Sequence, residues 1–117
     1  MTTSFNKLKF QNTIKSSIKL SGFGLHTGEM CNLTIKPLES GAGVIFKRID
    51  LKDKPEVEAL IDNVSDVTRS TSLKKGEAEI HTIEHILAAL YGLSIDNALI
   101  ELDNIEPPIL DGSSKPY

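Results

Sequence analysis

The chain has 117 residues, which is enough for one domain with a hydrophobic core but too few for two such domains. Hydrophobic residues make up 39% of it and charged residues 25%, a balance typical of a soluble globular protein. The formal net charge of −3 gives no bulk attraction for a nucleic-acid partner. The single cysteine, Cys31, excludes an internal disulfide and is typical of a reducing compartment.

No segment has the pattern of a signal peptide or a membrane span. The first residues lack an apolar core, and no apolar run approaches the roughly 18 residues that a transmembrane helix needs. We therefore expect a cytoplasmic protein. Residues 1–10 are polar and carry lysines, so we expect a flexible arm there and a folded domain over 11–117.

Alternation of apolar and polar residues predicts the strands. Residues 11–20 alternate with period two, which is typical of a half-buried strand. A shaped loop with three glycines follows over 21–28. Similar alternation, or a short apolar run, predicts four more strands, at 30–37, 44–49, 57–61 and 97–102.

A helix is predicted over 82–91, with His81 or Thr82 as its N-cap and Gly92 at the C′ position. The last residues, 111–117, resemble the opening of a second helix that stops after one turn, so the domain looks truncated there. Together these elements predict an α+β fold: a two-layer sandwich of a five-stranded, mostly antiparallel sheet with helices on one face.

The most informative segment runs from His81 to His85 and has the sequence HTIEH. It places two imidazoles and the carboxylate of Glu84 within five residues, and these are groups that bind zinc and accept a proton from zinc-activated water. The spacing is also the inverzincin peptidase signature. We expect His81 to precede the helix, however, which would remove the shared helical face that such a peptidase needs.

A series of segments along the chain forms a recognisable pattern, at 11–15, 22–28, 46–50, 82–85, 88–97 and 108–113. In their order and spacing these segments resemble the N-terminal domain of the zinc-dependent UDP-3-O-acyl-N-acetylglucosamine deacetylases of lipid A synthesis. The resemblance covers the chain from about residue 11 to its end, and its pattern favours the form of the enzyme fused to a dehydratase domain.

The resemblance implies a two-domain enzyme whose halves have the fold of ribosomal S5 domain 2, with the active site between them. It implies that His85 is a zinc ligand and that Glu84 is the general base in hydrolysis of the substrate's N-acetyl amide. It also implies that Leu25 and His26 lie at the rim of the site. Residues 68–70 would line the substrate entrance, with Arg69 near the diphosphate. The substrate-binding candidates are thus Leu25, His26, Thr68, Arg69 and Ser70.

The family's other two zinc ligands belong to an H-x-x-x-D motif of the second domain, and this chain has no such motif. We therefore expect an incomplete zinc site, an inactive isolated chain, a missing C-terminal domain as partner, and self-association through the exposed inter-domain face. Two alternatives stay open. One is a naturally short, non-catalytic relative that binds a partner domain, and the other is an inverzincin-like peptidase half.

Overall fold

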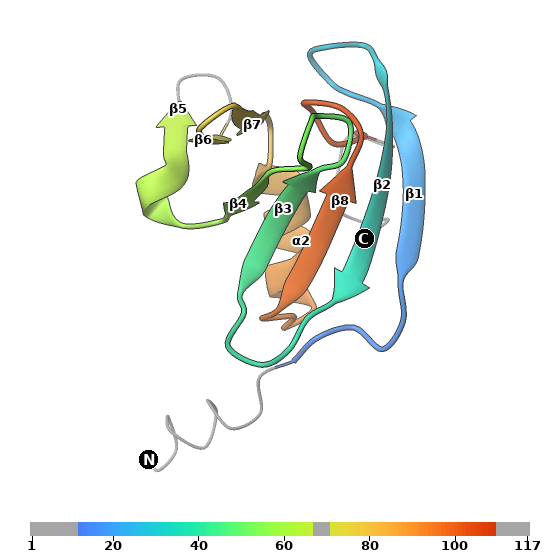
Figure 1. Cartoon of the computed structure of the whole chain (residues 1–117). Coiled ribbons are helices and arrows are strands. Elements are labelled where there is room, and N and C mark those ends of the chain that lie inside the picture. The colour runs from blue at the N-terminus through green and yellow to red at the C-terminus, as the bar shows by residue number, and fades with distance from the viewer. Residues whose placement is uncertain (1–11, 67–70, 110–117) are drawn as a thin grey trace.

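The computed structural model describes residues 12–66 and 71–109, and its main feature is a five-stranded sheet in the order β1-β2-β8-β3-β4 (Figure 1). Three neighbouring pairs are antiparallel, and β3 and β8 are parallel. Helix α2 (Glu84–Gly92) lies behind this sheet in Figure 1, so the predicted α+β fold is confirmed. The strands are β1 (Ile18–Phe23), β2 (Met30–Pro37), β3 (Val44–Arg48), β4 (Glu56–Glu58) and β8 (Ala98–Leu102).

The central strands bury every second side chain, as their alternation predicts. In β2 and β8 the pairs Leu33–Leu102 and Ile35–Ile100 face the helix side, where they meet Ile86 and Leu90 of α2 in one hydrophobic core. Cys31 is also fully buried in this core, as expected for a packing residue. The opposite sheet face carries many polar side chains; Lys36 and Glu101, for example, form an ion pair there at 3.0 Å.

A second, three-stranded sheet, which the sequence did not predict, lies beside the first (Figure 1). It consists of β5 (Val64–Asp66), β6 (Ser72–Lys75) and β7 (Ala78–Ile80), and the 3₁₀ helix η1 (Ile61–Asn63) precedes it. Its Leu73 and Ile80 side chains belong to the same core as the large sheet. This small sheet matters for function because β7 leads directly into the segment before α2.

Arg48 joins the two sheets. Its Nη1 donates a hydrogen bond to the carbonyl oxygen of Glu79 in β7 at 2.7 Å. Its Nε and Nη2 donate to the two oxygens of Asp50 at 2.9 and 2.7 Å, and these bonds hold the pKa of Asp50 below its ordinary value. The buried guanidinium therefore donates three hydrogen bonds to two residues and fixes β7 against the end of β3.

Two predicted boundaries are wrong. Strand β1 begins at Ile18 and continues to Phe23, because its pairing with β2 runs from Ile18–Ile35 to Phe23–Met30. The chain before it is held elsewhere: the carbonyl oxygen of Asn12 accepts hydrogen bonds from the backbone of residues 96 and 97 at 2.9 and 3.0 Å. The fourth predicted strand is shorter and earlier than expected, at Glu56–Glu58.

The predicted helix caps are also wrong. Ile83 occupies the N-cap position and makes no side-chain capping bond, whereas Thr82 has a left-handed backbone with φ of 54°. Gly92 is the last helical residue, and the left-handed residue after the helix is Ser94, with φ of 58°. In the part of the chain that the structure describes, no helix is long and apolar enough to cross a membrane. The expected arm at 1–10 and second helix at 111–117 lie outside the described residues.

Candidate functional site

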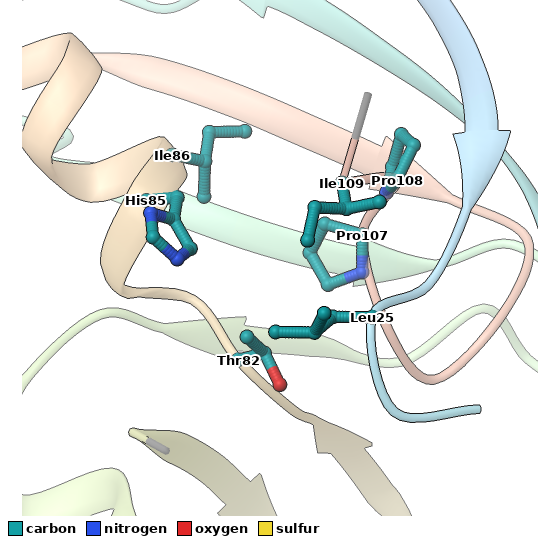
Figure 2. A pocket seen from close by; sticks show the side chains of 7 residues that line it. All are labelled: Leu25, Thr82, His85, Ile86, Pro107, Pro108 and Ile109. Carbon is teal, nitrogen blue, oxygen red and sulfur yellow. The ribbon is translucent and has the colours of Figure 1, made fainter. Parts of the chain in front are cut away.

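His85 lies in the first turn of α2 and lines a pocket (Figure 2). The imidazole is half-buried and makes no hydrogen bond or ion pair with the described residues. His85 and Ile86 form one side of the pocket in Figure 2, and Ile109 with two prolines forms the other. An imidazole with free nitrogens in such a place is available to a ligand. The pocket is lined by Leu25, Thr82, His85, Ile86, Pro107, Pro108 and Ile109.

Glu84 is the neighbouring residue, but its carboxylate is held by a different part of the chain. Its Oε1 accepts a hydrogen bond from the backbone N–H of Thr71 at 3.0 Å. No hydrogen bond from the described residues engages Oε2. The side chain is therefore oriented by one oxygen, while the other oxygen can still accept a proton or a hydrogen bond.

His81 does not join His85. Helix α2 begins at Glu84, so His81 lies outside it, between β7 and the helix. Its Nε2 lies 3.0 Å from Oε2 of Glu79, and its backbone N–H donates to the carbonyl oxygen of Ile105 at 2.8 Å. The two histidines thus do not share a helical face in the way that the inverzincin signature requires.

Leu25 and His26, the predicted rim residues, lie in the glycine-rich loop between β1 and β2. Leu25 lines the pocket and is about half exposed. The ring of His26 turns toward a buried carboxylate, with Nδ1 2.8 Å from Oε2 of Glu106. Thr68, Arg69 and Ser70 lie outside the described residues, so their predicted roles stay predictions.

Glu106 is the group that the sequence did not single out. Its side chain is only 1% exposed, and its carboxylate joins the segment after β8 to two other segments around the pocket, the glycine-rich loop and the turn before α2. Its Oε1 accepts hydrogen bonds from the backbone N–H groups of His26 and Thr27 at 2.8 and 2.9 Å. Its Oε2 accepts hydrogen bonds from Nδ1 of His26 and from the hydroxyl of Thr82. Burial tends to raise the pKa of Glu106, but these hydrogen bonds outweigh it and lower the pKa from 4.5 to about 2.

Glu106 also helps to fix the backbone conformation of Thr82, just before α2. A β-branched residue with φ of 54° is a strained conformation, which persists only where the surroundings fix it. The surroundings here are specific: the hydroxyl of Thr82 donates to Glu106, and the flanking backbone N–H groups of His81 and Ile83 donate to Ile105 and Thr71 at 2.8 and 3.0 Å. The turn that these contacts fix delivers the first residues of α2, including His85, to the pocket.

Sequence patterns could not have found Glu106 by chemistry, because its partners lie 24 to 80 residues away. The signal that the sequence does contain is its position: Glu106 lies two residues before segment 108–113, which carries the family resemblance. An acidic residue in that position is a reasonable candidate for a structural role in the site.

The chemistry of the imidazole of His85 is compatible with a single zinc ligand. Within residues 12–66 and 71–109, no group of three His, Cys, Asp or Glu side chains lies close enough to hold a metal ion. His85 has the free imidazole that a ligand needs, but a catalytic zinc usually has three protein ligands. The described residues alone thus do not make up such a site.

Comparison with known proteins assigns the domain. The sequence profile described as UDP-3-O-acyl N-acetylglycosamine deacetylase matches residues 11–117. The bifunctional enzyme LpxC/FabZ of Chlorobaculum tepidum is 54% identical over 107 residues, which cover 92% of this chain and 23% of that protein. A UDP-3-O-acyl-N-acetylglucosamine deacetylase of Geobacter sp. strain M21 is 45% identical over 108 residues, which cover 92% of this chain and 35% of that protein.

A second bifunctional LpxC/FabZ enzyme, from Porphyromonas gingivalis, is 50% identical over 107 residues, again 92% of this chain and 23% of the relative. The chain therefore spans about a quarter to a third of the length of these relatives. Its matched region nevertheless includes all of the strands and the helix described above. The chain belongs to the UDP-3-O-acyl-N-acetylglucosamine deacetylase (LpxC) family.

Proposed function

We propose that this domain is the N-terminal half of a zinc-dependent amidohydrolase that removes acetate from UDP-3-O-acyl-N-acetylglucosamine in lipid A synthesis. The observation that carries the proposal is the pair at the start of α2. The imidazole of His85 lies at a pocket and has no hydrogen-bond partner among the described residues, and beside it lies the oriented carboxylate of Glu84. Membership of the family and the names of the relatives support the same reaction.

In this proposal His85 is one zinc ligand, and the remaining ligands come from a second domain that the described residues do not include. The relatives support this division, because the chain matches only 23% to 35% of their length. When bound, zinc supplies a Lewis acid that activates water for attack at neutral pH. The isolated chain would then bind metal weakly and lack activity.

Glu84 would act as the general base that takes the proton of the attacking water. A base must be oriented and must keep a free acceptor, and Glu84 meets both needs: Oε1 is held by Thr71, and Oε2 is not engaged by the described residues. Leu25 and His26 would contact the sugar at the pocket rim. Residues 68–70, with Arg69, would lie toward the diphosphate.

The two alternatives make different predictions. An inverzincin-like peptidase half would need His81 as a ligand, yet His81 lies outside α2 and pairs with Glu79. A short, non-catalytic relative would bind a partner domain without needing Glu84.

A cytoplasmic location and a fused dehydratase domain also stay predictions.

A chimera tests the proposal. This chain would replace the matching 108 residues of the Geobacter enzyme, and release of acetate from UDP-3-O-acyl-N-acetylglucosamine would be measured. We expect activity in the chimera and a loss of at least about 100-fold in kcat for Glu84→Gln, as is typical when a general base is removed. His85→Ala should lose activity and zinc, whereas the matched control His81→Ala should keep both. A chimera whose activity survives Glu84→Gln would contradict the proposal.

A further inference from the structure

The carboxylate of Glu106 uses all of its accepting capacity. A carboxylate offers about four acceptor positions, and Glu106 receives four hydrogen bonds from three residues of two distant segments. Two come from backbone N–H groups of the glycine-rich loop, and two come from the His26 ring and the Thr82 hydroxyl. The side chain is 1% exposed, so water does not compete for these positions.

This arrangement determines which ring nitrogen of His26 carries a proton. An ionised carboxylate only accepts hydrogen bonds, so the His26 nitrogen that contacts it, Nδ1, must carry the proton. The hydroxyl of Thr82 lies 3.1 Å from the same nitrogen and already donates its own proton to Glu106, so it too can only accept from Nδ1. Two acceptors therefore converge on one ring nitrogen.

The other ring nitrogen of His26, Nε2, is left without a hydrogen bond from the described residues. The side chain is 48% exposed, and its neighbour Leu25 lines the pocket beside His85. In a neutral ring with the proton on Nδ1, Nε2 is an acceptor, and it suits a ligand group that donates a hydrogen bond, such as a sugar hydroxyl or an amide N–H.

We propose that Glu106 is a positioning residue that holds His26 in its Nδ1–H tautomer and thereby presents Nε2 as an acceptor to a hydroxyl or amide donor of the ligand. Glu106 itself does not touch the ligand in this scheme; it acts through His26 and Thr82. The inference rests on the proposed function only in treating the ligand as an amino sugar bound at this pocket.

The chain contains its own control. His81 also pairs with a carboxylate, but through the opposite nitrogen: its Nε2 lies 3.0 Å from Oε2 of Glu79. The carboxylate of that pair is far more exposed, with 36% of the Glu79 side chain accessible against 1% for Glu106. His81 therefore serves as a control within the same small domain, because its ring meets a carboxylate through Nε2, whereas the ring of His26 meets one through Nδ1.

Nitrogen-15 NMR of the imidazole rings tests this directly, since protonated and unprotonated ring nitrogens have well-separated shifts. Spectra of the whole chain would be recorded without metal or substrate at about pH 9, above the ordinary histidine pKa of about 6.5. His85→Ala and His81→Gln variants assign the three rings. We expect Nδ1 of His26 to be protonated. Glu106→Gln should shift His26 toward the Nε2–H form, while Glu79→Gln should alter His81 alone.

An Nε2–H form of His26 in the unsubstituted chain would overturn the inference, and so would an unchanged Nδ1–H form in folded Glu106→Gln. Amide dispersion shows whether that variant folds; if it does not, the tautomer of the unsubstituted chain decides the question. A purely structural acid would leave the His26 tautomer unaffected. The NMR measurement uses neither zinc nor substrate, so its result does not depend on whether the chimera is active. Equally, finding the Nε2–H tautomer of His26 would not contradict the deacetylase proposal.

Discussion

Gly24 and Glu106 lie so close together that a β-carbon at Gly24 would come within 2.4 Å of Oε1 of Glu106. The same β-carbon would lie 2.5 Å from Oγ1 of Thr27. The missing side chain of Gly24 is what allows the glycine-rich loop to wrap closely around the buried carboxylate. This contact joins the loop after β1 to the segment after β8 and so shapes the pocket that His85 lines.

Gly24→Ala should therefore destabilise the protein, because Glu106 is fixed by four hydrogen bonds and cannot move away freely. We expect the free energy of unfolding to fall by about 2 kcal/mol, a typical cost of overpacking. Gly92→Ala is the matched control, since no atom lies within 4 Å of a β-carbon there and the site is helical. Urea denaturation should show that the control is unchanged or more stable; equal effects would refute the proposed contact.

Glu106 should also make the free energy of unfolding depend on pH in the acidic range. Its pKa is lowered from 4.5 to about 2 in the folded protein, so the folded state favours the ionised form. Its contribution is fully present above about pH 4.5 and is lost as the pH falls toward 2. We expect the free energy of unfolding to fall by a few kcal/mol across this window.

Glu106→Gln should flatten that acid-dependent part of the stability curve. Glu101→Gln, which removes only a surface ion pair with Lys36, should leave the curve nearly unchanged. Denaturant titrations at a series of pH values measure both. A Glu106→Gln protein with the same acid dependence as the unsubstituted chain would mean that this carboxyl does not have the low pKa that its hydrogen bonds imply.

Cys31 should be unreactive in the folded protein. Burial in the core and the nearby charge of Asp103 raise the pKa of its thiol to about 12, so thiolate is scarce at neutral pH. We expect a thiol reagent to modify Cys31 only as fast as the domain unfolds, and rapidly in denaturant. Fast labelling under native conditions, with no change in the amide spectrum, would contradict the buried position.

The outer face of α2 should promote self-association. Tyr91 is 87% exposed and Leu93, just after the helix, is 57% exposed, so both side chains are accessible to a second molecule. We expect sedimentation to show oligomers of the unsubstituted chain and a shift to monomer in Tyr91→Lys. Leu60→Lys, at an exposed apolar residue outside α2, is the control. A monomer at every concentration would count against an exposed inter-domain face.

The large sheet was predictable because its pattern is local. Residues such as Leu33, Ile35 and Ile100 alternate with polar neighbours, and this period alone assigns them to a buried face. The start of β1 was not predictable, because the alternation continues before Ile18 while the pairing with β2 does not. The small strands β6 and β7 are four and three residues long, too short to show a period.

The site was predictable only in part, for a similar reason. His85 and Glu84 stand out because their spacing and their place before an apolar helix are features of one short segment. Glu106 acts through contacts with His26, Thr27 and Thr82, which only the fold brings together. The same long-range contact explains the wrong cap prediction: the Thr82 hydroxyl binds Glu106 instead of the helix N-terminus.

Zinc affinity of the purified chain after chelator treatment tests the central claim most directly, measured beside His85→Ala and His81→Ala. If the chain supplies one ligand of a shared site, zinc should bind with a dissociation constant of about 1 µM or weaker, which corresponds to roughly −8 kcal/mol. His85→Ala should abolish this binding and His81→Ala should not affect it. Tight stoichiometric binding, or an equal loss in His81→Ala, would contradict the account and indicate a complete site within this chain.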